Sequence, residues 1–124
     1  MLGKAILWIS ALVFSSYGLM CLLSPQLPAG YAGLAITNGD AYVEMGAMYG
    51  GLQLGFGLFC LLGALRKDLF RPALTALLLL VGGLALSRLG LTAISVDPVA
   101  GYTYGALAFE WTLAVLAALA LRRA

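Results

Sequence analysis

Six side chains that can carry a charge or form strong hydrogen bonds lie within, or at the edge of, long apolar runs of this sequence. They are Tyr17, Glu44, Tyr49, Gln53, Arg88 and Glu110. A charge in the hydrocarbon core of a membrane costs a few kcal/mol, so charged residues there face the protein interior and pair with one another. We therefore expect an ion pair between Arg88 and Glu110, with Glu44 as a candidate second partner.

The elements that must position these residues follow from composition. Of the 124 residues, 63% are hydrophobic and 10% are charged, whereas soluble domains are about 25% charged. Four apolar runs, each near the roughly 20 residues that a spanning helix needs, cover residues 5–23, 43–65, 73–94 and 104–121. A β-barrel is disfavoured because these runs are continuous rather than alternating. We predict an all-α integral membrane four-helix bundle, a single transmembrane domain over residues 1–124.

Charge placement predicts the topology. With four crossings, both termini and the middle loop, residues 66–72, share one side of the membrane. Six of the seven positive residues fall on that side, namely Lys4, Arg66, Lys67, Arg71, Arg122 and Arg123. Because Lys and Arg favour the cytoplasmic side, we predict that both termini are cytoplasmic, in a multi-pass protein of a bacterial inner membrane. Residues 24–42 and 95–103 are then outer loops, and the first of these is open to interpretation as a lid or as a surface helix.

Helical periodicity places the six polar residues relative to one another. Glu110 shares a face with the small residues Ala114 and Ala117, which indicates an inward position. Tyr49 and Gln53 share a second-helix face, and Tyr17 lies on a polar face of the first helix. Glu44 lies nearly opposite Gln53 unless the second helix starts irregularly. The pattern predicts a polar chamber in the outer half of the bundle, interpreted either as a ligand site or as a purely structural network.

The glycines indicate close helix packing. Gly46 with Gly50, and Gly51 with Gly55, put small residues on two sides of the second helix, and Gly83 and Gly90 continue a stripe on the third. Small residues four apart let helix backbones approach each other in membranes.

Other chemistries lack the residues they need. Cys21 and Cys60 lie at different depths, about 15 Å apart along the membrane normal, too far for a disulfide, so we expect two buried apolar thiols. With no His and no clustered thiols, we predict no metal site and no cofactor. Nucleic acid binding has no support, because topology already accounts for the positive residues.

Two motifs and one helix carry a family resemblance. Residues 49–55 read Tyr-Gly-Gly-x-Gln-x-Gly, residues 82–88 read Gly-Gly-x-x-x-x-Arg, and both accompany the helix that holds Glu110. Together they resemble the bacterial membrane family called domain of unknown function 4345, and more broadly the DoxX-like four-helix proteins. The resemblance implies an inner-membrane four-helix protein, marks Glu44, Tyr49, Gln53, Arg88 and Glu110 as the matching polar positions, and implies no reaction.

Three functions remain open. The favoured one is binding or transport of a small amphipathic or lipid-like molecule, its polar end held by Arg88, Glu110, Gln53 and Tyr49. The second is an accessory or assembly subunit whose glycine faces dock a larger membrane complex or a second copy, with the buried charges structural. The third and least favoured is an isomerase-like enzyme acting on a lipid, with Glu110 as its acid-base group.

Overall fold

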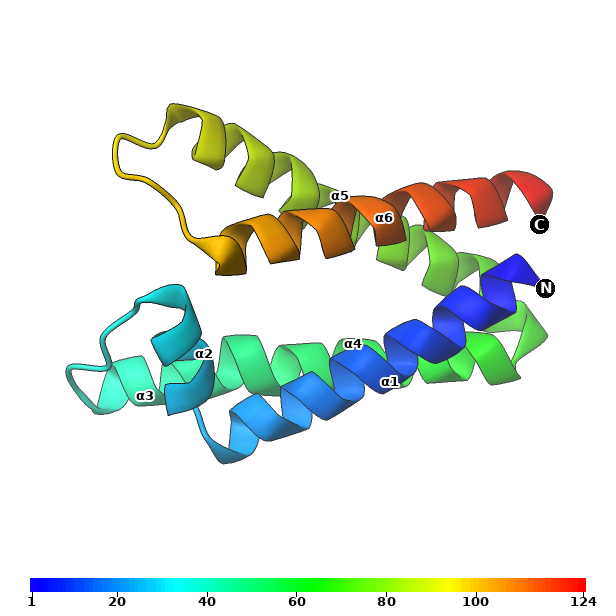
Figure 1. Ribbon diagram of the computed structural model, residues 1–124. Coiled ribbons are helices and arrows are strands. Elements are labelled where there is room, and N and C mark those ends of the chain that lie inside the picture. Colours follow the sequence, from blue (N-terminus) through cyan, green and yellow to red (C-terminus); the bar gives the residue numbers. More distant parts are fainter. The chain divides into compact units, whose positions relative to one another are not determined.

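The computed structural model describes residues 1–124 and is entirely helical. In chain order the elements are α1 (Leu2–Leu23), α2 (Gln26–Ala32), α3 (Gly39–Met45), the π-helix η1 (Gly46–Gly51), α4 (Leu52–Leu65), α5 (Lys67–Ile94) and α6 (Gly101–Arg123) (Figure 1). Four helical stretches are long and apolar enough to cross a membrane; the second of them, Gly39–Leu65, joins α3, η1 and α4. The chain is therefore an all-α, multi-pass membrane protein.

All four spans begin earlier than their apolar runs. The clearest case is α5, which starts at Lys67 rather than Ala73, so that the predicted loop 66–72 shrinks to Arg66 and Pro72 lies inside the helix. Arg66 is extended (φ −115°, ψ 126°) and its guanidinium binds the Asp68 carboxylate at 2.8 Å. An acidic side chain in the first turn also stabilises the helix through its favourable interaction with the helix dipole. Charged residues that precede an apolar run can therefore belong to the first turns of its helix.

The segment predicted to be the first outer loop contains a short helix. α2 ends at Gly33, whose backbone is left-handed (φ 71°), and the amide of Leu34 donates to the carbonyl of Ala29 at 2.8 Å. This is the usual role of glycine after a helix C-terminus. The second span then starts at Gly39, because the Asn38 side chain caps it by accepting a hydrogen bond from the amide of Ala41 at 2.8 Å. The sequence left this segment open to interpretation as a lid or as a surface helix, and the structure contains a helix there.

The chain divides into two compact units. The central unit is Trp8–Leu62, and the terminal unit combines Met1–Leu7 with Gly63–Ala124. In the central unit α1 packs on η1 and α4 through glycine: a Cβ added to Gly50 would lie 2.6 Å from the Leu22 Cα, and one on Gly57 would collide with Ser15. The prediction of close packing is thus confirmed for Gly50. By contrast, a Cβ on Gly51, Gly55, Gly83 or Gly90 would meet no atom within 4 Å, so for these residues it is wrong.

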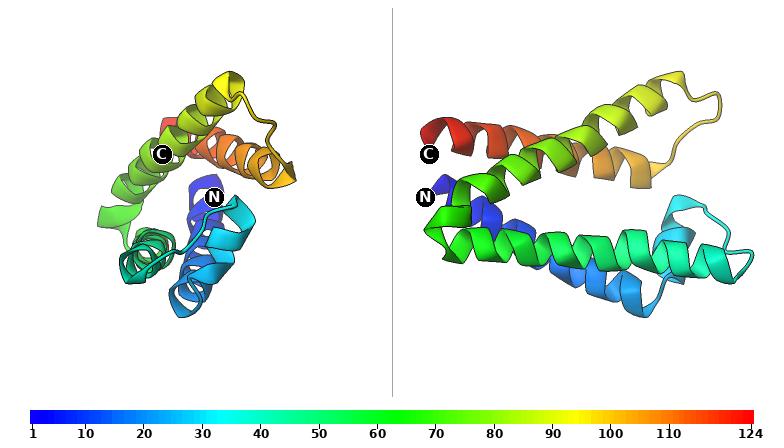
Figure 2. Two further views of the ribbon diagram at one scale, coloured as in Figure 1. Left: turned by 90° about the vertical axis from the view of Figure 1, so that its left-hand side faces the viewer. Right: turned by 180° about the vertical axis from the view of Figure 1, so that it is seen from behind.

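The terminal unit is organised around α5 and α6. Figures 1 and 2 show these helices crossing and then diverging toward the loop that joins them. Their buried residues recur three or four positions apart, as one helix face requires: Leu74, Leu77, Val81 and Ala85 on α5, and Glu110, Leu113, Ala114, Ala117 and Ala120 on α6. The burial of Glu110 with Ala114 and Ala117 confirms the predicted inward face. At the far end Arg71 donates to the carbonyl of Ala124 at 2.8 Å.

Candidate functional site

One ion pair joins the two long helices of the terminal unit. Arg88 lies six residues before the end of α5, about 9 Å along its axis, and Glu110 lies nine residues after the start of α6, about 14 Å along its axis. Because the helices run antiparallel, these positions meet at similar height in the half of the unit next to the α5–α6 loop. The side-chain Nη2 of Arg88 donates to Oε1 of Glu110 at 2.8 Å, which confirms the predicted pair.

The contact is bidentate and unequally buried. Nε of Arg88 also donates to Oε2 of Glu110 at 3.0 Å, so the guanidinium fork matches both carboxylate oxygens. Such charge-assisted bonds are roughly twice as strong as neutral ones. The Glu110 side chain is only 8% exposed, whereas that of Arg88 is 27% exposed. The carboxylate is therefore enclosed and the guanidinium reaches an open space.

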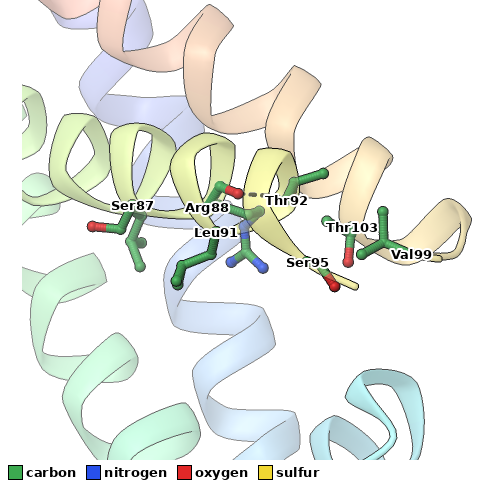
Figure 3. Close-up of a pocket in the computed structure, with 8 residues that line it drawn as sticks. Ser87, Arg88, Leu91, Thr92, Ser95, Val99 and Thr103 are labelled. Carbon is green, nitrogen blue, oxygen red and sulfur yellow. Dashed lines mark hydrogen bonds between the residues drawn. The ribbon is translucent and has the colours of Figure 1, made fainter. Parts of the chain in front are cut away.

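That open space is a groove between α5 and α6, which we call the α5–α6 groove. It has a volume of about 380 Å³, and Figure 3 shows Arg88 among the residues around it. The lining residues are Leu84, Ser87, Arg88, Leu91, Thr92, Ser95, Val99 and Thr103. Ligand sites of small molecules run from about 300 to 1,000 Å³ and combine apolar walls with a few polar groups, so the groove has the size and the character of such a site.

Two hydroxyl groups in the groove already donate their hydrogens to the backbone. Oγ1 of Thr92 donates to the carbonyl of Arg88 at 2.7 Å, the dashed bond in Figure 3, and Oγ of Ser95 donates to the carbonyl of Asp97 at 2.7 Å. A hydroxyl oxygen keeps lone pairs when its hydrogen is donated. Both oxygens thus remain hydrogen-bond acceptors.

The other predicted site residues belong to the central unit. Tyr17 on α1, Tyr49 on η1 and Gln53 on α4 are half-buried, and Glu44 on α3 is exposed. The π-helix η1 lies between Glu44 and Gln53. Because a π-helix has wider turns than an α-helix, these two residues are not held opposite each other as they would be in a regular helix. Their convergence with Arg88 on one chamber stays a prediction.

Sequence reasoning did not assign the hydroxyl residues to the site. Thr92 and Ser95 follow Arg88 by four and seven positions, and Leu84 precedes it by four, so all share its helix face. That spacing on either side of an intramembrane charge was the sequence signal that could have assigned these residues to the site. Thr103 comes from the start of α6, and its place beside α5 depends on how the two helices cross.

The cysteines and acidic residues form no further centre. Cys21 and Cys60 are both buried free thiols, as predicted. No group of three or more His, Cys, Asp or Glu side chains lies close enough to hold a metal ion. The chemistry available at the groove is therefore that of an ion pair, hydroxyl groups and apolar side chains.

Comparison with known proteins gives one result. The family model described as Domain of unknown function (DUF4345) matches residues 2–121, nearly the whole chain. No curated protein and no solved structure matches it. The resemblance carried by residues 49–55 and 82–88 is thereby confirmed, and the broader likeness to DoxX-like proteins stays a prediction.

Proposed function

The chain belongs to the DUF4345 family, and from that premise we propose that this multi-pass membrane protein binds or transports a small amphipathic molecule in the α5–α6 groove. One observation carries the proposal: Arg88, half of a bidentate ion pair, lines a groove that also contains leucine and hydroxyl side chains. The polar end of the ligand would lie at Arg88 and the hydroxyl groups, and its apolar part along Leu84 and Leu91.

The unequal burial of the two charges supports a ligand site over a purely structural pair. A pair that only fixes helix packing gains most when both partners are enclosed, because the interaction weakens where water or headgroups reach it. Glu110 is enclosed, but the Arg88 side chain keeps 27% of its surface exposed toward a groove. Ionisable residues within membrane helices mark ligand or ion pathways by default.

The proposal includes a membrane orientation. Lys4, Arg66, Lys67, Arg71, Arg122 and Arg123 all belong to the terminal unit, and Arg71 bonds the last residue, which joins the start of α5 to the end of α6. Six positive residues at one end favour cytoplasmic termini in an inner membrane. The groove, at the opposite end of α5, would then open in the outer leaflet.

The remaining predicted site residues lie in the central unit. Tyr17, Tyr49 and Gln53 are half-buried and Glu44 is exposed, and their part in ligand binding stays a prediction. The π-helix η1, which holds Tyr49 and follows Glu44 closely, supports a functional role for this segment, because π-helical turns are frequent at functional sites.

The test must separate a charge pair kept for folding from one kept for binding. In the double variant Arg88→Met/Glu110→Leu no buried charge is left unpaired, and such apolar replacements are often neutral or stabilising. We expect native mass spectrometry of protein extracted from its own membranes to find a small-molecule adduct on the wild type and none on the folded double variant.

The matched control is the exposed pair of the same geometry. Arg66 and Asp68 also bond at 2.8 Å, but their side chains are 61% and 62% exposed and do not line the groove. The variant Arg66→Gln/Asp68→Asn should keep the adduct. An adduct that survives in Arg88→Met/Glu110→Leu would return the buried pair to a structural role.

A second candidate is an accessory subunit of a larger membrane complex. The observation in its favour is that a Cβ on Gly51, the last residue of η1, or on Gly55 of α4 would meet no atom within 4 Å, which leaves a small-residue face of the second span open to another helix. Gly55→Leu should then abolish a crosslinked complex in native membranes, while Gly105→Leu, at an equally open glycine of α6, should not. If the wild type forms no crosslinked complex, this candidate fails.

A further inference from the structure

The charges around the α5–α6 groove do not favour an anion, although an arginine lines it. Three charged residues occur between Leu84 and Glu110: Arg88 is positive, and Asp97 and Glu110 are negative, for a net charge of −1. The carboxylate of Glu110 accepts hydrogen bonds from Nε and Nη2 of Arg88 at 2.8–3.2 Å. The positive charge at the groove is thus already offset by the carboxylate of Glu110.

The helix dipoles offset each other as well. The C-terminal end of α5 and the N-terminal end of α6 both reach the groove, through Ser95 and Thr103. They carry about half a unit of negative and positive charge respectively. Together the two ends therefore add little net attraction for an anionic head group.

Two of the hydroxyl groups that line the groove, those of Thr92 and Ser95, favour a ligand that donates hydrogen bonds. The oxygens of Thr92 and Ser95 are acceptors, because their hydrogens are already donated to the carbonyls of Arg88 and Asp97. A hydroxylated head group can donate to such oxygens, whereas a carboxylate, sulfate or phosphate in its ionised form has only acceptors to offer. At Thr92 and Ser95 an ionised head group would face two acceptor oxygens with no hydrogen between them, so its hydrogen bonds would be limited to the hydroxyl groups of Ser87 and Thr103 and to the Arg88 guanidinium, which Glu110 already binds.

From these observations we propose that the α5–α6 groove selects amphiphiles with an uncharged, hydrogen-bond-donating head group, such as a glycerol monoester, over anionic amphiphiles with the same chain. This proposal rests on the proposed function, and it adds the chemical class of the ligand. The head group would donate to Thr92 and Ser95, and the chain would lie along Leu84 and Leu91.

The test compares two probes that share an oleyl-length chain. Monooleoylglycerol has two hydroxyl groups and no charge, and oleyl sulfate is ionised at any pH used. Each is titrated onto the full chain in lipid nanodiscs, and the bound fraction is read by native mass spectrometry. We expect the wild type to bind monooleoylglycerol at least about tenfold more tightly, the equivalent of one or two net hydrogen bonds.

Two variants test the cause of the preference. Thr92→Val has a nearly identical shape and lacks the acceptor oxygen, so monooleoylglycerol should bind about fivefold more weakly and oleyl sulfate should be unaffected. Thr112→Val is the matched control, because Oγ1 of Thr112 donates to the carbonyl of Ala108 at the same 2.7 Å but does not line the groove. Glu110→Gln exposes the charge of Arg88 and should shift the preference toward oleyl sulfate.

The outcomes are distinct. Wild-type protein that binds oleyl sulfate as tightly as monooleoylglycerol overturns the head-group selection and leaves the proposed function standing. Wild-type protein that binds neither probe removes the proposed function and this inference with it. Equal effects of Thr92→Val and Thr112→Val would also overturn the selection, because the acceptor in the groove would then have no special role.

Discussion

In the central unit α1 meets η1 and α4 through glycine backbone, whereas in the terminal unit α5 meets α6 through apolar residues and one ion pair. A Cβ on Gly50 would lie 2.6 Å from the Leu22 Cα, and further along the two helices the rings of Phe14 and Phe56 pack edge to face at 5.0 Å, next to the contact of Gly57 with Ser15. The α5–α6 contact instead opens into a groove that contains Arg88. Close backbone contact leaves no room for a ligand, whereas diverging helices create room and bring polar groups into it.

The difference separates two ways to hold membrane helices together. Glycine contacts gain dispersion energy from many atom pairs and require no partner chemistry. An ion pair must keep both partners, because either charge alone is costly in an apolar surrounding. We therefore expect the terminal unit to be more sensitive to a single charge change, and the central unit to a single change of volume.

The largest expected effect is the loss of one partner of the buried pair. Glu110→Leu leaves the guanidinium of Arg88 without its carboxylate and should lower the free energy of unfolding by about 3 kcal/mol, the low end for a buried pair because Arg88 is partly exposed. Unfolding in mixed micelles measures this. The double variant Arg88→Met/Glu110→Leu should recover most of the loss; if it is as unstable as Glu110→Leu, the unpaired charge is not the cause.

A smaller effect is expected where the central unit is tightest. Gly50→Ala places a methyl group against the backbone of Leu22, and overpacking of this kind costs about 1–3 kcal/mol. Gly51→Ala is the neighbouring control: its methyl group would meet no atom within 4 Å, and replacing glycine in a helix gains up to about 1 kcal/mol. The same unfolding assay should therefore give opposite signs for these two substitutions, and equal signs would contradict the glycine contact.

The smallest effect is expected for the exposed ion pair. Arg66→Ala removes a bidentate contact with Asp68 whose two side chains are 61% and 62% exposed. Exposed pairs contribute little to stability, so the free energy of unfolding should fall by less than in Glu110→Leu or Gly50→Ala, and by less still at high salt. A loss as large as that of Glu110→Leu would mean that burial does not explain the difference between the two pairs.

The helix start at Lys67 shows where sequence reasoning was less accurate. The apolar run begins at Ala73, and the charged residues before it resembled a loop. The first turn of a helix accommodates charged residues because its amide groups have no partners within the helix. A boundary predicted from hydropathy therefore marks where the apolar part of a helix begins, and the helix itself can begin several residues earlier.

The sequence by itself determined the four spanning helices and the Arg88–Glu110 pair. Both follow from local rules: continuous apolar runs form helices in a membrane, and two isolated opposite charges at similar depth must meet. Only the tertiary structure decided that the pair opens on a groove, that Thr92 and Ser95 present acceptor oxygens there, and which glycines are in contact. These depend on how far α5 and α6 diverge and how closely α1 approaches α4, and such distances arise from the packing of whole helices, which residue spacing along one helix does not encode.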